Sequence, residues 1–464
     1  MVSISFFQDI LSNLSNRGKA LIDFSFSGSH ESLEDLCLAL LSSRGEASGV
    51  AMAQQILDRY ETLEEEDKGT FFTFLAKKIQ PSSRQISEAA SAYLFHPGAE
   101  SLDRLARAVE SPQQEFFRRL NLAPGATAKI VSMRADLFPY IRDDSDLKRL
   151  DRDLQHLLTS WFNRGFLVLH LIDWNTPASI LEKIIAYEAV HQIKGWDDLR
   201  RRLDPKDRRC FGYFHPSLFD EPLIFVEVAL TDQIPGSIQN LLEQKSEDSD
   251  SETINTAVFY SISNCQPGLR GISFGHFLIK QVASDLHNEN PSLKTFVTLS
   301  PLPGFRKWLD QNYKDDDQRL DKSQRSSLQT LRADAGLKHD ILPSEETDIL
   351  NLAVEYLINA KNTKQRPLDP VARFHLGNGA SLEQVHIRGD LSENGWRQSY
   401  GIMVNYLYDL TEIEKNHEAF VNDGTIAISK GLRSRARQLE KEQRGDGSRA
   451  MIAKPREIEA ETED

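Results

Sequence analysis

Apolar residues recur at three- and four-residue spacing from the start of the chain to about residue 165. This is the spacing that places side chains on one face of a helix. Turn-forming sequences interrupt the pattern, among them HPGAE at 96–100 and Pro124-Gly125. The pattern predicts an all-α N-terminal bundle over residues 1–165.

The clearest helix is the last one in this region, where an apolar stripe runs from Leu147 to Trp161. We expect Ser145 to cap its start, because a serine oxygen accepts hydrogen bonds from the free N–H groups of a first turn. The stripe faces either the protein core or a partner subunit. A sequestered core is favoured, and oligomerisation through this domain remains an alternative.

After Gly165 short β-branched and aromatic runs replace the helical spacing. They are FLVLHLI (166–172), PLIFVEVAL (222–230), TAVFYSIS (256–263) and KTFVTLS (294–300). Helical segments separate these predicted strands, so residues 166–431 are expected to form a mixed α/β domain. Residues 432–464 are rich in charge and poor in large apolar side chains, which predicts a helical or disordered tail. The whole chain is therefore assigned to the α+β class.

Composition narrows the function and the compartment. With 55 Lys and Arg against 69 Asp and Glu, the net charge of −14 disfavours broad binding to nucleic acid or an anionic membrane. The 3 cysteines are far apart and form no CxxC pair, which suits a reducing compartment and disfavours structural zinc. Asp9 lies inside the first apolar stretch and the basic residues follow it, so we expect no signal peptide, and the sequence has no apolar run of roughly 20 residues. A cytoplasmic protein without a membrane span is expected.

The first chemical candidate is NCQPGLRGISFG (264–275), which joins a predicted strand to a predicted helix. Free backbone N–H groups at a helix start bind phosphate, and glycines let the phosphate approach closely. Arg270 and Lys280 add positive charge. A glycine-bearing turn of this kind more often only reverses the chain, so the residues alone leave both interpretations open.

The run Arg270-Gly271-Ile272-Ser273-Phe274-Gly275 resembles the acyl-CoA loop of the GNAT acetyltransferase superfamily, with Ser273 in place of the usual middle glycine. Further segments resemble the malonyl-CoA decarboxylase family in order: AYEAVHQIKGWDDLRRR (186–202), EPLIFVEVAL (221–230), FYSIS (259–263), FLIK (277–280), TLSPLPGFRKWL (298–309), ARFHLGNGA (372–380) and GIMVNYLY (401–408). The resemblance implies an N-terminal helical domain followed by a GNAT-like acyl-CoA-binding domain.

By position, the resemblance implies that Ser300 is the catalytic serine, that His375 is the proton donor and that a family tyrosine falls on Tyr408. Some members of the family carry an acidic residue where this chain has Ser273, so no carboxylate role transfers. The substrate-binding residues are expected in the loop, namely Arg270, Gly271, Ile272, Ser273, Phe274, Gly275 and His276.

Each of these residues also has an ordinary structural interpretation. Ser300 precedes Pro301 and could simply form a turn, and a lone histidine such as His375 is more often a hydrogen-bonded structural residue. Asn378-Gly379 is most simply a hairpin turn before the predicted strand SLEQVHI, and Tyr408 could serve only in packing. Arg306 and Lys307 would ordinarily be exposed charges on a helix. Their location also makes them candidates to contact a phosphate of CoA.

The implied reaction is loss of CO2 from malonyl-CoA to give acetyl-CoA. The electron pair left behind spreads onto the thioester oxygen as an enolate, and a histidine with a pKa of about 6.5 can supply the proton. Because the thioester is the electron sink, we expect no cofactor and no metal. No HExxH, GxSxG or GxxxxGK[ST] motif is present.

Two other functions remain as alternatives, a CoA-dependent acyltransferase of GNAT fold and a non-catalytic CoA-binding assembly protein. The expected ligands are malonyl-CoA and acetyl-CoA. A homo-oligomer formed through the helical domain is also expected, with a tetramer among the options.

Overall fold

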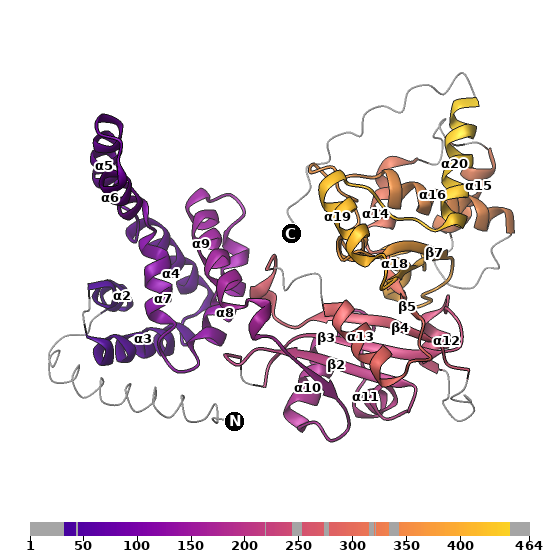
Figure 1. The fold of residues 1–464 in the computed structure, drawn as a ribbon, viewed down its shortest axis with the longest axis horizontal. Coiled ribbons are helices and arrows are strands. Elements are labelled where there is room, and N and C mark those ends of the chain that lie inside the picture. Colours follow the sequence, from indigo (N-terminus) through magenta and orange to yellow (C-terminus); the bar gives the residue numbers. More distant parts are fainter. Residues whose placement is uncertain are drawn as a thin grey trace. The chain divides into compact units, whose positions relative to one another are not determined.

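The structure is a computed structural model that describes residues 32–42, 45–218, 220–243, 253–272, 278–314, 320, 322–333 and 343–445. It confirms the α+β class, with helices first and a mixed sheet afterwards (Figure 1). The chain forms two compact units. The first comprises residues up to Val168 with the segments Tyr213–Leu223 and Cys265–Phe274, and the second comprises Leu169–Gly212, Ile224–Asn264 and Gly275 onward.

The core of the first unit is a bundle whose helices bury their apolar faces against one another. These helices are α2 (Leu33–Ser42), α3 (Glu46–Glu61), α4 (Glu65–Lys78), α7 (Pro112–Leu120), α8 (Ala126–Leu137) and α9 (Ser145–Trp161), with the 3₁₀ turn η1 (Phe138–Tyr140) after α8. The apolar stripe of α9 is buried from Leu147 to Leu158, so the core interpretation is confirmed. The expected cap is wrong, because α9 already begins at Ser145. The side chain of Asp144 accepts the N–H groups of Asp146 and Leu147 instead.

Helices α5 (Ser83–Phe95) and α6 (Ala99–Val109) form a hairpin that extends away from the rest of the first unit (Figure 1). Helix α5 buries only Ala89, and α6 buries no residue. Leu94 and Phe95 are 78% and 81% exposed at the end of α5. The hairpin is therefore amphipathic but leaves much of its apolar side in contact with solvent.

The second unit is built on a sheet with the strand order β1-β2-β3-β4-β5-β8-β6, in which β7 also pairs with β8. The strands are β1 (Val168–Ile172), β2 (Arg208–Phe214), β3 (Pro222–Thr231), β4 (Thr256–Asn264), β5 (Thr295–Thr298), β6 (Ser300–Pro301), β7 (Ser381–His386) and β8 (Met403–Leu407). Strand β3 is buried along its whole length, which explains its continuous apolar sequence. Strands β2 and β8 were not predicted; both are buried over most of their length, so exposed and buried positions do not alternate along them.

The helices of the mixed region are α10 (Ala178–Tyr187), α11 (Trp196–Leu203), α12 (Ile238–Glu243), α13 (Leu278–Glu289), α14 (Phe305–Asn312), α15 (Lys322–Ala333), α16 (Pro343–Asn359), α17 (Pro370–Gly377), α18 (Glu393–Ser399), α19 (Ile413–Asp423) and α20 (Lys430–Gly445); the 3₁₀ turns η2 (Arg164–Phe166) and η4 (Pro267–Leu269) complete the set. Helix α20 begins two residues before the predicted tail and packs on α16, with Leu432 buried and Arg435 donating to Asn351 at 2.9 Å.

Strands β4 and β5 are parallel, and their register runs from Thr256 opposite Thr295 to Phe259 opposite Thr298. Beyond that point β4 continues beside β3, whereas β6 pairs with β8. The register of β3 with β4 shifts at Glu227, as expected for a β-bulge. The two parallel strands therefore part immediately before Ser300.

Candidate active site

The three residues expected to carry the chemistry come from three separate elements and meet in one hydrogen-bonded chain. The Oγ atom of Ser300 lies 3.0 Å from Nε2 of His375, and Nδ1 of the same ring lies 2.8 Å from the hydroxyl of Tyr408. Ser300 is 5% exposed, His375 3% and Tyr408 1%. The buried chain links a strand end, a helix and the residue after β8.

His375 is held by helix α17, whose start is fixed by Asp369. One oxygen of the Asp369 carboxylate accepts the N–H of Ala372 at 2.9 Å, and Pro370 occupies the first helical position, where its missing N–H costs nothing. The predicted hairpin at Asn378-Gly379 is wrong, because this capped helix runs to Gly377 and Asn378 is its C-cap. The imidazole therefore projects from the last turn of a helix.

Asp369 also connects this helix to the segment that follows Ser300. Its second oxygen accepts the N–H of Gly304 and the hydroxyl of Tyr356, each at 3.3 Å. A Cβ atom on Gly304 would lie 2.2 Å from that hydroxyl, so only glycine fits. Burial raises the pKa of Asp369, although the hydrogen bonds that it accepts oppose this effect. The carboxylate thus ties the helix of His375 to the turn beside Ser300.

Thr298 and Tyr406 complete the chain, and the sequence interpretation missed both. Ser300 donates its hydroxyl to Oγ1 of Thr298 at 2.8 Å, and the N–H of Tyr406 donates to the same oxygen at 3.2 Å. The Tyr406 ring stacks on His375 with centroids 4.6 Å apart, and its buried hydroxyl has no hydrogen-bond partner among the described residues. Each stands two positions before a predicted residue, so strand alternation places it on the same side once the strands are known.

The environment strongly disfavours a charged imidazole. Burial lowers the pKa of His375 to about 3, because the described protein places no counter-ion against the ring. Burial also raises the pKa of Tyr408 and of Tyr406 well above the ordinary value of a phenol. All three side chains are therefore neutral near pH 7 when no anion is bound.

These contacts allow the hydrogen atoms to be assigned. Ser300 uses its proton toward Thr298, so its oxygen accepts from Nε2–H of His375. Nδ1 is then unprotonated and accepts from Tyr408. The single ring proton of His375 thus points toward Ser300, while Tyr408 supports the opposite side of the ring.

The expected acyl-CoA loop is described only in part. Arg270, Gly271 and Ile272 belong to the first unit, whereas Ser273, Phe274, Gly275 and His276 lie outside the described residues. Gly271 has a φ of 76°, which favours glycine, and the guanidinium of Arg270 lies 4.4 Å from the ring centroid of Phe138.

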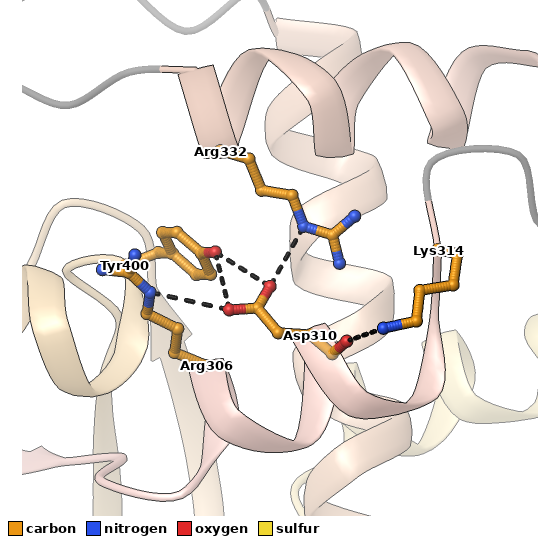
Figure 2. A pocket seen from close by; sticks show the side chains of 5 residues that line it. All are labelled: Arg306, Asp310, Lys314, Arg332 and Tyr400. Carbon is orange, nitrogen blue, oxygen red and sulfur yellow. Dashed lines mark hydrogen bonds and ion pairs between the residues drawn. The ribbon is translucent and has the colours of Figure 1, made fainter.

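A shallow depression of about 280 Å³ lies beside α14 (Figure 2). Figure 2 shows Arg306 and Arg332 turned toward the carboxylate of Asp310, to which the hydroxyl of Tyr400 also donates at 3.0 Å. The Arg306 guanidinium also lies 4.6 Å from the centroid of the Tyr400 ring. Of the two helix cations, Arg306 is thus engaged with neighbouring side chains, while Lys307 is exposed.

The described residues contain no helix that is long and apolar enough to cross a membrane. Over the same residues, no group of three or more His, Cys, Asp or Glu side chains is arranged to hold a metal ion. Cys37, Cys210 and Cys265 are all buried, and none of the three forms a disulfide.

Comparison with known protein families gives a match for two successive regions of the chain. Residues 79–162 match the family described as the malonyl-CoA decarboxylase N-terminal domain, and residues 165–446 match the corresponding C-terminal domain. Together the two matches run from the start of the α5–α6 hairpin to the end of α20 and leave out only residues 163 and 164 between them.

Related proteins and solved structures agree with these family matches. The mitochondrial malonyl-CoA decarboxylase of Anser anser anser is 32% identical over 81% of this chain and 78% of its own length; that of Rattus norvegicus is 31% identical over 88% and 86%. The crystal structure of malonyl-CoA decarboxylase from Rhodopseudomonas palustris is 51% identical, with a TM-score of 0.82 over 87% of this chain and 98% of that one. The Agrobacterium vitis structure is 48% identical, with a TM-score of 0.81 over 87% and 99%.

Proposed function

This protein belongs to the malonyl-CoA decarboxylase family, and on that premise we propose that it converts malonyl-CoA to acetyl-CoA and CO2. The reaction takes place at the hydrogen-bonded side chains of Ser300, His375 and Tyr408. The observation that carries this proposal is the contact of 3.0 Å between Nε2 of His375 and Oγ of Ser300. A proton donor and a hydroxyl meet there in a buried place beside the point where β4 and β5 part.

In the proposed reaction the bond between the α-carbon and the carboxylate breaks. The electron pair moves into the thioester as an enolate, and CO2 leaves. The α-carbon then takes a proton from Nε2 of His375, so each turnover consumes one proton. The thioester itself accepts the electron pair, and the chemistry therefore requires no further group.

Burial lowers the pKa of His375, which opposes its protonation, and the anionic substrate counteracts this effect. A carboxylate placed a few ångströms from an imidazole favours the imidazolium, and the enolate inherits that negative charge after CO2 leaves. The proton is thus drawn to His375 when the substrate is bound. Tyr408 holds the other ring nitrogen, and Ser300 orients the Nε2 side and hydrogen-bonds the carboxylate or relays the proton.

We place the nucleotide part of the substrate against the loop of Arg270, Gly271, Ile272, Ser273, Phe274, Gly275 and His276. One feature of the described part supports this placement: Gly271 lies in the left-handed region, with a φ of 76°. Free N–H groups before a helix suit the pyrophosphate of CoA.

The α5–α6 hairpin supports a further proposal, that the helical domain (residues 1–165) joins copies of this chain while residues 166–431 carry catalysis. Leu94, Phe95, Leu102 and Val109 are exposed on the hairpin. Exposed apolar side chains gathered on one element mark association surfaces. A tetramer is among the expected states. Replacing Leu94 and Phe95 with serine should reduce the mass measured by light scattering; an unchanged mass would contradict this surface.

We propose a cytoplasmic location, which three buried cysteines that form no disulfide support. The named animal relatives are mitochondrial, so fractionation of expressing cells tests this point directly.

Incubation of the purified protein with malonyl-CoA tests the proposed function. The expected products are equal amounts of acetyl-CoA and CO2. Transfer of the acyl group to an added amine would indicate the acyltransferase alternative, and binding of CoA without turnover would indicate a non-catalytic assembly protein.

A further inference from the structure

Arg134 of α8 is buried in the first unit, with 3% of its surface exposed. It contacts the loop expected to bind acyl-CoA, which belongs to the same unit. Its Nη1 atom donates to the carbonyl oxygens of Gly268 and Arg270, both at 2.8 Å. Its Nε atom donates to Oδ1 of Asp151 on α9 at 2.7 Å. One guanidinium thus spans two carbonyls of the loop and a carboxylate of the bundle.

Neighbouring contacts hold the same part of the loop, from Gly268 to Gly271. A Cβ on Gly268 would lie 1.8 Å from the carbonyl oxygen of Val131, so the loop touches the backbone of α8 at that point. Gln155 of α9 donates to the carbonyl of Gly271 at 3.1 Å, and the Phe138 ring lies against the guanidinium of Arg270. The first half of the loop is therefore shaped by helices of the N-terminal bundle.

We propose that Arg134 is a positioning residue for substrate binding, which sets the conformation of the loop that holds the CoA pyrophosphate. This inference rests on the proposed function of that loop. In a trans peptide the C=O of one residue and the N–H of the next point in opposite directions, and no described peptide is cis. By attracting the Arg270 carbonyl, Arg134 turns the Gly271 N–H away from the helices, toward a ligand.

The guanidinium suits this task better than an ammonium would. Its planar fork presents several fixed donors, so the carboxylate and both carbonyls are satisfied at once. Holding the loop before the substrate arrives lowers the ordering cost of binding. The benefit should appear in affinity for the nucleotide part and not in the chemical step.

The experiment compares Arg134→Lys with a matched control, Arg119→Lys. Arg119 on α7 donates Nη1 to the carbonyls of Leu40 and Leu41 at 2.9 and 2.8 Å and Nε to Glu115 at 2.7 Å, the same arrangement at a distance from the loop in sequence and element. Arg134→Lys should raise KM for malonyl-CoA about tenfold with kcat within about twofold. Arg119→Lys should leave both constants unchanged.

A second substrate separates positioning from general damage. Malonyl-pantetheine lacks the pyrophosphate, so kcat/KM for it should be equal in wild type and Arg134→Lys. If Arg134→Lys lowers kcat/KM for both substrates alike, or leaves KM for malonyl-CoA unchanged, the proposal is wrong. Should that variant fail to fold, Gln155→Ala decides by removing only the bond to Gly271, with an expected rise in KM of about threefold.

A wild type that forms no acetyl-CoA would defeat the proposed function separately. Calorimetry with CoA then tests the loop alone. Weaker binding by Arg134→Lys than by Arg119→Lys supports the positioning role, and equal binding overturns it.

Discussion

The phenolic hydroxyl of Tyr408 lies 2.8 Å from Nδ1 of His375, on the side of the ring opposite Ser300. Tyr408→Phe should lower kcat about tenfold with little change in KM, because the ring loses the donor that fixes its proton on Nε2. Steady-state kinetics measures the change. Tyr140→Phe is the control, since the Tyr140 hydroxyl donates to Glu65 in the helical unit. Equal kcat values for Tyr408→Phe and wild type would remove Tyr408 from the mechanism.

We expect Tyr406 to support catalysis through its ring and not through its hydroxyl. Because the hydroxyl is buried without a hydrogen-bond partner among the described residues, Tyr406→Phe should raise the free energy of unfolding by about 1 kcal/mol and keep kcat within about threefold. Tyr406→Leu removes the ring stacked on His375 and should lower kcat about tenfold. Chemical denaturation and kinetics on both variants provide the measurement. A large loss of kcat in Tyr406→Phe would show instead that the hydroxyl contacts substrate.

Asp369 should affect both stability and catalysis. Asp369→Ala removes the cap of α17 and the link to Gly304, so it should cost about 2 kcal/mol of unfolding free energy and lower kcat about tenfold. Asp144→Ala is the matched control, because Asp144 caps α9 in the helical unit. It should cost about 1 kcal/mol and leave kcat unchanged. Loss of kcat in both variants alike would indicate a stability effect only.

The pH dependence follows from the buried imidazole. Since the pKa of His375 is about 3 in the free protein, its protonation should produce no inflection in kcat/KM between pH 5 and 8. Subtracting the NMR spectrum of His375→Gln from that of wild type identifies the ring signal, which should not shift over this range. A midpoint near 6.5, the value of an unperturbed histidine, would contradict the buried neutral form.

The same shift has a consequence for stability. The unfolded chain binds a proton at this histidine below about pH 6.5, whereas the folded chain does so only near 3. The contribution of the neutral ring is therefore fully present above pH 6.5 and is lost as the pH falls toward 3. Denaturation of wild type and His375→Gln at pH 7.5 and 5 measures it: the wild type should lose more stability than the variant between these values.

The sequence predicted the helical bundle and most strands, because both depend on local apolar spacing that the structure preserves. It could not separate the cap Asp144 from Ser145, since both are good capping residues one position apart. The helix of His375 was missed because it is short and because its cap, Asp369, lies before the motif ARFHLGNGA (372–380).

The candidate site shows the same limit. Resemblance predicted roles for Ser300, His375 and Tyr408, but nothing in their spacing showed that they touch, since 75 positions separate the first two. Thr298 and Tyr406 follow from strand alternation only once the strands are known. The contact of Arg134 with the loop spans 134 positions to Gly268 and depends wholly on tertiary packing.

The most direct measurement is single-turnover formation of acetyl-CoA and CO2 from malonyl-CoA by wild type, Ser300→Ala and His375→Ala. The wild type should release both products in equal amounts. His375→Ala should react at least about a hundredfold more slowly and Ser300→Ala at least about tenfold more slowly, while CoA binding stays within about twofold. Turnover by His375→Ala at the wild-type rate would contradict the proposed role of His375 as the proton donor.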